Sequence, residues 1–219
     1  MHPPQAFVQP LRFTGPSPAS SSSSLSSLLG SSSSSSNETI SLYNHVTNTT
    51  QPLFSVHTSK SKPNLAISRI QPNGNTTPLA TAKISSMTGK ITIQLFTRTG
   101  QEIPIVLKTD MMDISAAKTF SCPQGNFRWK PKDSGTGHEL MTDDGMKTEI
   151  ARWLTSDESG LSMKGYPRLE ILGQQGDEFI EVVLVTGLAT LKAEEKEVKQ
   201  AVKVIKFMTG DVGSLLTGS

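Results

Sequence analysis

Short runs of β-branched and aromatic residues fill the chain from Glu38 onward, separated by residues that favour turns. In one clear run, Ile91, Ile93 and Leu95 alternate with Thr92, Gln94 and Phe96, as in a strand with one inward face. The runs predict eleven strands, at Ile40–Asn44, Pro52–Thr58, Leu65–Gln71, Leu79–Ser86, Lys90–Thr97, Glu102–Lys108, Lys118–Ser121, Asn126–Lys130, His138–Thr142, Glu149–Leu154 and Arg168–Leu172. This pattern favours a mainly β fold, either an antiparallel barrel or a sandwich.

The alternation stops at Glu178. Residues Glu178–Leu191 are mostly apolar on every side, and the charged segment that follows keeps an apolar stripe at helical spacing. We therefore predict one helix from about Asp177 to at least Ala201. A helix without a polar face needs to be enclosed by protein or lipid.

Two alternatives to this helix stay open. Three valines, Val182, Val183 and Val185, also suit a strand, and a closing strand is the alternative for Val202–Thr209. A membrane span is not expected, because the apolar run is shorter than the roughly 20 residues needed and contains Glu181.

The first part of the chain has a different composition. Between Ser17 and Ser36, 14 of 20 residues are serine, which predicts a disordered Ser/Pro-rich tail over residues 1–36. We expect one domain over residues 37–209 and a flexible tail over 210–219. No basic segment followed by an uninterrupted apolar run opens the chain, so a cytoplasmic location is expected, with nuclear and membrane-peripheral locations as alternatives.

Charge and cysteine content exclude several classes of protein. The chain has 21 basic and 19 acidic side chains, a net charge of +2 that is too small to predict a nucleic-acid partner. The charge is unevenly distributed along the chain. Residues 37–120 carry eight basic and four acidic side chains, whereas residues 121–219 carry twelve and fifteen. The single cysteine, Cys122, excludes an internal disulfide and a cysteine-rich zinc module.

The order of several segments resembles an uncharacterised fungal family that is placed in the tubby-like fold, beside the LURP-one-related proteins and the phospholipid scramblases. The similar segments are Lys118–Ser121, Phe127–Lys130, Ala151–Trp153, Leu169–Leu172 and Glu178–Glu197. The resemblance covers roughly Glu38 to Thr209. It implies an antiparallel β-barrel that encloses the hydrophobic C-terminal helix, and a peripheral membrane or lipid-binding role. The chain departs from these relatives in lacking the cysteine-rich palmitoylation run of scramblases and an obvious dense basic patch.

Basic side chains on neighbouring predicted hairpins are the candidates for binding an anionic ligand, either a phospholipid or an acidic protein. They are Lys60, Lys62, Arg69, Lys83 and Lys90. The alternative is that these side chains guard sheet edges and keep the fold soluble. A second basic segment surrounds Trp129, and alternation favours a core tryptophan with solvated neighbours at Arg128 and Lys130.

No catalytic, cofactor or metal site is predicted. His138-Glu139 and Asp143-Asp144 lack a metal-ligand spacing, and Asp143-Asp144-Gly145 suits a turn. Glu181 is unusual as a carboxylate in an enclosed helix, so it requires a partner or a place at the barrel mouth. We therefore predict a non-enzymatic binding or scaffold module. The alternatives are a thiol-dependent enzyme or redox sensor that uses Cys122, and an interaction adaptor that acts through the serine-rich tail.

Overall fold

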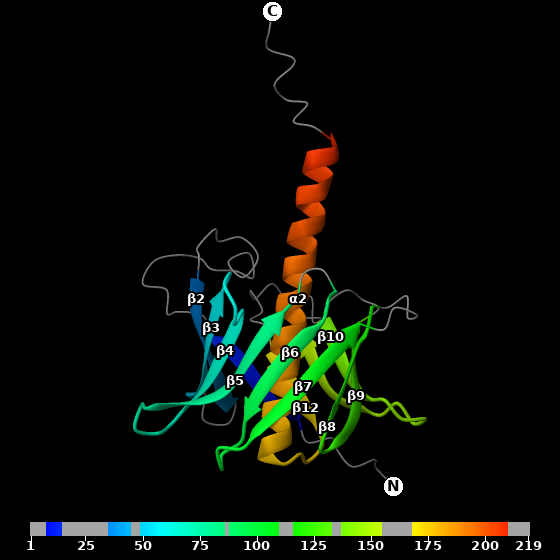
Figure 1. Cartoon of the computed structure of the whole chain (residues 1–219). Helices are drawn as coiled ribbons and strands as arrows, with labels where there is room; N and C mark the ends of the chain where they lie inside the picture. Colours follow the sequence, from blue (N-terminus) through cyan, green and yellow to red (C-terminus); the bar gives the residue numbers. More distant parts are fainter. Residues whose placement is uncertain are drawn as a thin grey trace, which may run out of the picture.

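The computed structural model describes residues 8–14, 35–44, 49–85, 88–109, 116–132, 137–154 and 168–209. Within these ranges the chain forms strands followed by one long helix (Figure 1). The strands are β1 (Val8–Thr14), β2 (Ser35–Asn44), β3 (Thr49–Ser59), β4 (Leu65–Ile70), β5 (Thr76–Ile84), β6 (Ile91–Phe96), β7 (Glu102–Thr109), β8 (Lys118–Cys122), β9 (Gly125–Pro131), β10 (Gly137–Thr142), β11 (Glu149–Leu154) and β12 (Arg168–Leu172), and the helix is α2 (Asp177–Thr209).

A single antiparallel sheet contains these strands in chain order. From β2 to β12 each strand pairs with the next one along the chain. Strand β1 pairs with β12 on one side and with β2 on the other, so it joins the two ends of the sheet. All eleven predicted strands are present, with ends that differ by a few residues. The mainly β class with one C-terminal helix is confirmed.

Strand β1 (Val8–Thr14) lies within residues 1–36, where we expected a disordered tail and predicted no strand. Strand β2 also begins earlier than predicted, at Ser35. The physical reason is that β1 obtains its backbone partners from strands distant in sequence, such as Leu11 opposite both Leu169 and Leu42. Most of the serine-rich segment, and the predicted tail over 210–219, lie outside the described residues.

Helix α2 runs through the middle of the curved sheet (Figure 1). Every residue from Glu181 to Thr190 is buried, which confirms the prediction of an enclosed helix over the apolar run. The helix is longer than expected and continues to Thr209, so the alternatives of a strand in the valine-rich run and a closing strand over Val202–Thr209 are wrong. A closing strand would need an unpaired sheet edge, and β1 already occupies both edges. No helix among the described residues combines the length and apolarity that crossing a membrane requires.

Two tryptophans, from the strands on either side of β10, pack against the helix. Trp129 on β9 and Trp153 on β11 are almost completely buried, which confirms the prediction of a core tryptophan at 129. The indole Nε1 of Trp129 donates a hydrogen bond of 3.0 Å to Oγ1 of Thr186. Gly187 allows this contact, because a Cβ at that position would lie only 3.0 Å from Cζ2 of Trp129.

Candidate functional site

The five predicted cations separate into two groups at opposite ends of the sheet. Lys60 and Lys62 lie in the β3–β4 connection, Lys83 lies near the end of β5, and Lys90 directly precedes β6. Arg69 lies at the other end of β4, opposite Phe54 and Thr77. The structure thus brings Lys60, Lys62, Lys83 and Lys90 to one end of the sheet, and β4 places Arg69 a strand length away from them.

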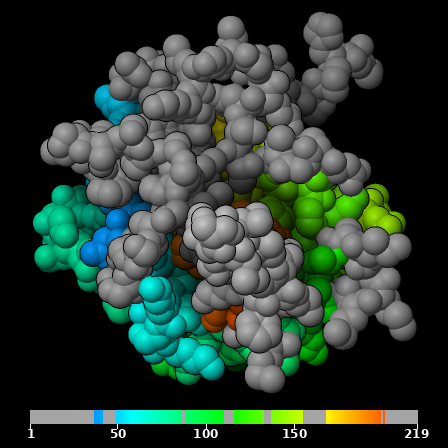
Figure 2. Space-filling view, turned by 90° about the horizontal axis from the view of Figure 1, so that it is seen from above, coloured from blue at the N-terminus to red at the C-terminus, as the bar shows by residue number. Residues whose placement is uncertain are grey.

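The four lysines lie at the end of the sheet from which α2 emerges. The β3–β4 connection is fastened to β5, because the side-chain Oδ1 of Asn64 accepts a 2.8 Å hydrogen bond from the backbone N of Ile84. Nζ of Lys196 on α2 donates a 3.1 Å hydrogen bond to the backbone oxygen of the same Ile84. Figure 2 looks onto this end and shows the cyan β3–β4 segment at the surface near orange atoms of α2. Connection, strand and helix thus meet at one residue.

A fifth lysine, which sequence reasoning missed, joins this group. Lys108 follows Leu107, which pairs with Ile91, so Lys108 on β7 reaches the same end of the sheet as Lys90. The register of the β6–β7 hairpin was the signal that could have revealed it. We call Lys60, Lys62, Lys83, Lys90 and Lys108 the basic rim. All five are exposed, and none forms an ion pair with any of the described residues.

Further along the same end, polar residues of α2 attach the helix to the sheet. The carboxylate of Glu197 lies 3.4 Å from Nζ of Lys118, a lysine on β8 that is almost fully buried. Nε2 of His138 on β10 lies 2.7 Å from the carboxylate of Glu194. His138 therefore contacts a helix carboxylate and not the Asp143-Asp144 turn. No cluster of three or more possible metal ligands occurs in the part of the chain that the structure describes.

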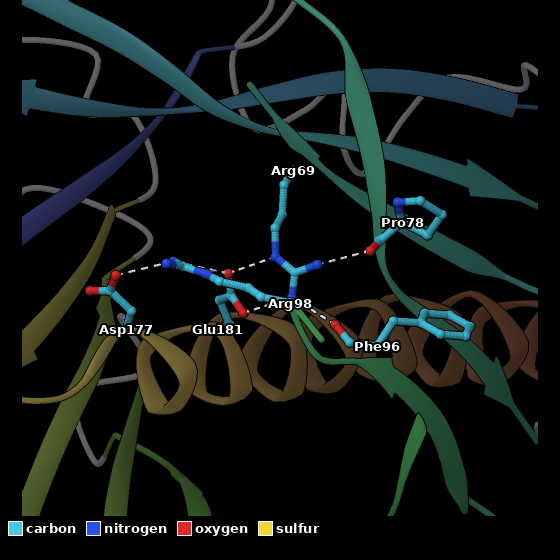
Figure 3. Close-up of polar contacts among 6 residues, drawn as sticks. All are labelled: Arg69, Pro78, Phe96, Arg98, Asp177 and Glu181. Atoms are coloured by element: carbon cyan, nitrogen blue, oxygen red, sulfur yellow. Dashed lines mark hydrogen bonds and ion pairs between the residues drawn. The ribbon is translucent and has the colours of Figure 1, made fainter. Parts of the chain in front are cut away.

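Arg69 is the ion-pair partner of the buried carboxylate of Glu181. Nε and Nη2 of Arg69 donate hydrogen bonds of 2.7 and 2.8 Å to the two carboxylate oxygens of Glu181. The side chains are only 14% and 5% exposed, so this is a bidentate, largely buried ion pair between β4 and α2. The remaining donors of Arg69 reach the backbone oxygens of Pro78, at 2.9 Å, and Phe96, at 2.7 Å (Figure 3).

A second arginine lies beside this buried pair. Nη2 of Arg98, in the β6–β7 turn, lies 3.1 Å from Oδ2 of Asp177 and 3.6 Å from Oε1 of Glu181 (Figure 3). Unlike Arg69, Arg98 is 56% exposed and Asp177 is 71% exposed. This outer pair is therefore surrounded by water, and it stabilises the fold by no more than about 1 kcal/mol.

These four charged residues border an open cleft of about 910 Å³ where the first turn of α2 lies inside the sheet. Most of its other walls are apolar. They come from β3, β4, β5, β6 and α2, and include Leu53, Phe54, Ile70, Pro78, Phe96 and Ile180. Because Glu181 is paired with Arg69, the exposed charged groups that line the cleft are those of Arg98 and Asp177.

Cys122, at the end of β8, is a free and partly buried thiol. Burial raises the pKa of the Cys122 thiol, although the backbone N–H groups of Gln124 and Gly125 partly oppose this effect. A raised pKa leaves less thiolate at neutral pH, and the thiolate is the reactive form. The environment of Cys122 therefore disfavours the chemistry of the thiol alternative.

The turn at Asp143-Asp144 has a structural explanation. The carboxylate of Asp144 accepts hydrogen bonds from the hydroxyl of Thr142 and from the backbone N of Met146 and Lys147. The hydrogen bond from the Thr142 hydroxyl is the largest cause of the lowered pKa of Asp144, and the backbone N–H groups of Met146 and Lys147 lower this pKa further. Asp143 forms an ion pair of 3.1 Å with Arg128. Asp144 therefore stabilises the β10–β11 connection, and Asp143 joins this connection to β9.

Comparison with known proteins gives one result. A family model described as a family of unknown function (DUF6593) matches residues 34–196, which include strands β2 to β12 and the enclosed part of α2. No curated protein and no solved structure matches the chain at a significant level. Because the family model covers more than half of the chain, the protein belongs to the DUF6593 family.

Proposed function

We propose that this protein is a non-catalytic module that docks on an anionic phospholipid surface through the basic rim. The observation that carries the proposal is that five exposed lysines, without ion-pair partners among the described residues, lie at one end of a rigid sheet. Lysines that only maintain solubility are usually interspersed with acidic side chains. Here they come from four neighbouring elements, and the α2 carboxylates of Glu194 and Glu197 at this end contact His138 and Lys118.

The strength of such docking follows from the number of lysines. Each Lys near an anionic membrane contributes about 1 kcal/mol, so five give a few kcal/mol at most. Since the interaction acts across water, it falls off over a Debye length of about 8 Å at physiological ionic strength. The expected binding is therefore reversible and sensitive to salt.

Apolar contact would add to this electrostatic attraction. Val198 of α2 is 59% exposed, two residues beyond Lys196, which contacts the sheet at the basic rim. The backbone of α2 continues as a helix to Thr209 and stands clear of the strands (Figure 1). Basic and apolar side chains at one end of a molecule are the combination that interfacial helices use on membranes.

The tubby-like kinship is part of the same proposal. An antiparallel sheet in chain order around one apolar C-terminal helix supports it, as do the buried tryptophans Trp129 and Trp153 in the segments that carry the resemblance. We propose a barrel of this kind as the scaffold of the basic rim. The raised pKa of Cys122 supports a binding role over thiol catalysis.

Liposome sedimentation of the full chain tests the proposal. We expect the protein to pellet with vesicles containing phosphatidylserine or phosphoinositide, not with neutral phosphatidylcholine vesicles, and to be released by high salt. The triple variant Lys62→Glu/Lys83→Glu/Lys108→Glu should lose this binding. The single variant Lys62→Glu reverses one charge of the basic rim. Its matched control is Lys147→Glu, which reverses the charge of another exposed lysine, in the β10–β11 connection.

Two results would overturn the proposal. One is that the unmodified protein fails to pellet with anionic vesicles at low salt. The other is that the triple variant, with unchanged circular dichroism, pellets as well as the unmodified protein. In either case the lysines of the basic rim would be solubility residues.

A further inference from the structure

We propose a second ligand site, at the opposite end of the sheet from the basic rim: the cleft beside Arg69 and Glu181 binds an apolar molecule that carries one carboxylate, of the fatty-acid class. This site is independent of the docking function proposed above. It depends on the shape of the cleft, on the state of its two arginines and on the position of the start of α2.

The cleft has the size and lining of a ligand site. Its volume of about 910 Å³ lies within the range of roughly 300–1,000 Å³ typical of small-molecule pockets. Side chains such as Leu53, Phe96 and Ile180 form apolar walls, and the four charged lining residues contact one another. An apolar chain placed there would remove these walls from water, which is favourable in proportion to the area covered.

Arg69 is not the residue that would hold the carboxylate. Each of its three guanidinium nitrogens already donates a hydrogen bond, to Glu181, Pro78 or Phe96. Removing Arg69 from Glu181 would leave a buried carboxylate without a counter-charge, which is strongly unfavourable. The pair thus forms a fixed, neutral floor of the cleft.

Arg98 is free to change partner. Glu181 is satisfied by Arg69, and the 3.6 Å contact from Arg98 to Glu181 is a secondary one. The closer partner of Arg98 is Asp177, and this exposed pair holds the guanidinium weakly. A ligand carboxylate could accept two hydrogen bonds from the same guanidinium in a fork-shaped pair.

The dipole at the start of α2 favours an anionic ligand over a cationic one. Asp177 is also exposed, so a cationic ligand is the competing possibility. However, Asp177 lies in the first turn of α2, where the helix dipole favours negative charge. The dipole stabilises Asp177 after Arg98 leaves it, and it also favours a second anion at the border of the cleft.

Isothermal titration calorimetry of the full chain with dodecanoate, below its micelle-forming concentration, tests this site. We expect saturable binding of dodecanoate, weaker binding of butyrate, and little binding of dodecyltrimethylammonium. Arg98→Gln should weaken dodecanoate binding about tenfold or more, whereas Arg98→Lys should retain part of it. Lys147→Glu, in the β10–β11 connection and outside both proposed sites, is the control and should leave binding unchanged.

A variant without a charge change gives a second measurement. Thr77 lines the cleft from β5, and Thr77→Trp should fill part of the volume and reduce dodecanoate binding while Arg98 stays in place. The proposal is overturned if dodecanoate gives no saturable heat, if Arg98→Gln binds it unchanged, or if dodecyltrimethylammonium binds as tightly. Circular dichroism of each variant confirms that binding is compared between folded proteins.

Discussion

At the scale of single residues, buried polar groups of α2 are matched to partners on the sheet. The hydroxyl of Thr186 accepts the indole hydrogen of Trp129 and donates to the backbone oxygen of Val182. Glu181 is matched to Arg69 in the same way, but with charges. An unmatched buried polar group costs about 1–3 kcal/mol, so these contacts fix how far the helix is inserted and how it is rotated.

A comparison of Thr186 with Thr190 tests how much the hydrogen bonds of buried polar groups contribute to stability. Both side chains are buried on the same face of α2, but Oγ1 of Thr190 has no hydrogen-bond partner among the described residues. Thr186→Val should lower the free energy of unfolding by about 1–3 kcal/mol, because the indole N–H of Trp129 loses its acceptor. Thr190→Val should be neutral or stabilising. Urea unfolding followed by tryptophan fluorescence measures both, and equal losses in the two variants would contradict the assignment.

Replacing one member of the buried ion pair should be much more damaging than replacing both. Glu181→Ala leaves the guanidinium of Arg69 buried without its counter-charge, and we expect a loss of about 3–5 kcal/mol in unfolding free energy. In Arg69→Met/Glu181→Leu both charges are absent, so most of this loss should be recovered. A double-mutant cycle in urea provides the measurement. A single variant that costs less than about 1 kcal/mol would show that water reaches the pair.

At the scale of elements, α2 is held at both ends by polar contacts and in its middle by apolar packing. Glu181 contacts β4 near the start of the helix, and Glu194, Lys196 and Glu197 contact β10, β5 and β8 further along. Neighbouring strands also come close to one another, as the backbones of β10 and β11 do at Gly137. Gly137 opens β10 with φ of 154°, opposite Leu154 of β11.

Substitution of Gly137 tests the approach between β10 and β11. A Cβ at this position would lie 1.8 Å from the backbone oxygen of Trp153, and backbone atoms cannot move aside as a flexible side chain can. Gly137→Ala should therefore lower the unfolding free energy by more than about 3 kcal/mol or prevent folding. Gly145→Ala is the control, since a Cβ there meets no atom within 4 Å. Thermal unfolding compares the two, and similar melting temperatures would refute the prediction.

At the scale of the whole molecule, the two ends of the sheet differ in chemistry, and β1 connects the sheet's two edge strands. The end from which α2 emerges carries the basic rim, and the end at which α2 begins carries the apolar cleft with Arg98 and Asp177. Both proposed sites depend on a rigid arrangement of strands. Strand β1 contributes to it through its pairings with β12 and β2.

Removal of residues 1–14 tests the contribution of β1. Its loss leaves β2 and β12 as unpaired edges, which are templates for association with other chains. We expect a decrease of about 2 kcal/mol or more in unfolding free energy, because each of several lost backbone hydrogen bonds contributes about 1 kcal/mol. Light scattering during gel filtration should show larger species than the full chain. Removal of residues 210–219 is the control, and identical behaviour of both truncated chains would contradict the role of β1.

Local residue patterns were sufficient to predict eleven strands and the helix. A strand such as Ile91–Phe96 has its alternation within the segment, and the apolar run of α2 is visible without knowledge of its surroundings. The sequence also indicated that Glu181 needs a partner, because a carboxylate inside an apolar helix is unfavourable alone. These properties depend on the segment itself and on the solvent, so no knowledge of distant residues was needed to predict them.

The folded structure alone established the contacts between residues far apart in the sequence. It brought Arg69, 112 positions away in sequence, to Glu181, separated Arg69 from the lysines and placed Lys108 beside Lys90. It also gave β1 its two neighbours and so left no edge for a closing strand after α2. The physical reason is that strand register and the insertion depth of the helix are set by the simultaneous packing of all strands around α2, which no local pattern contains.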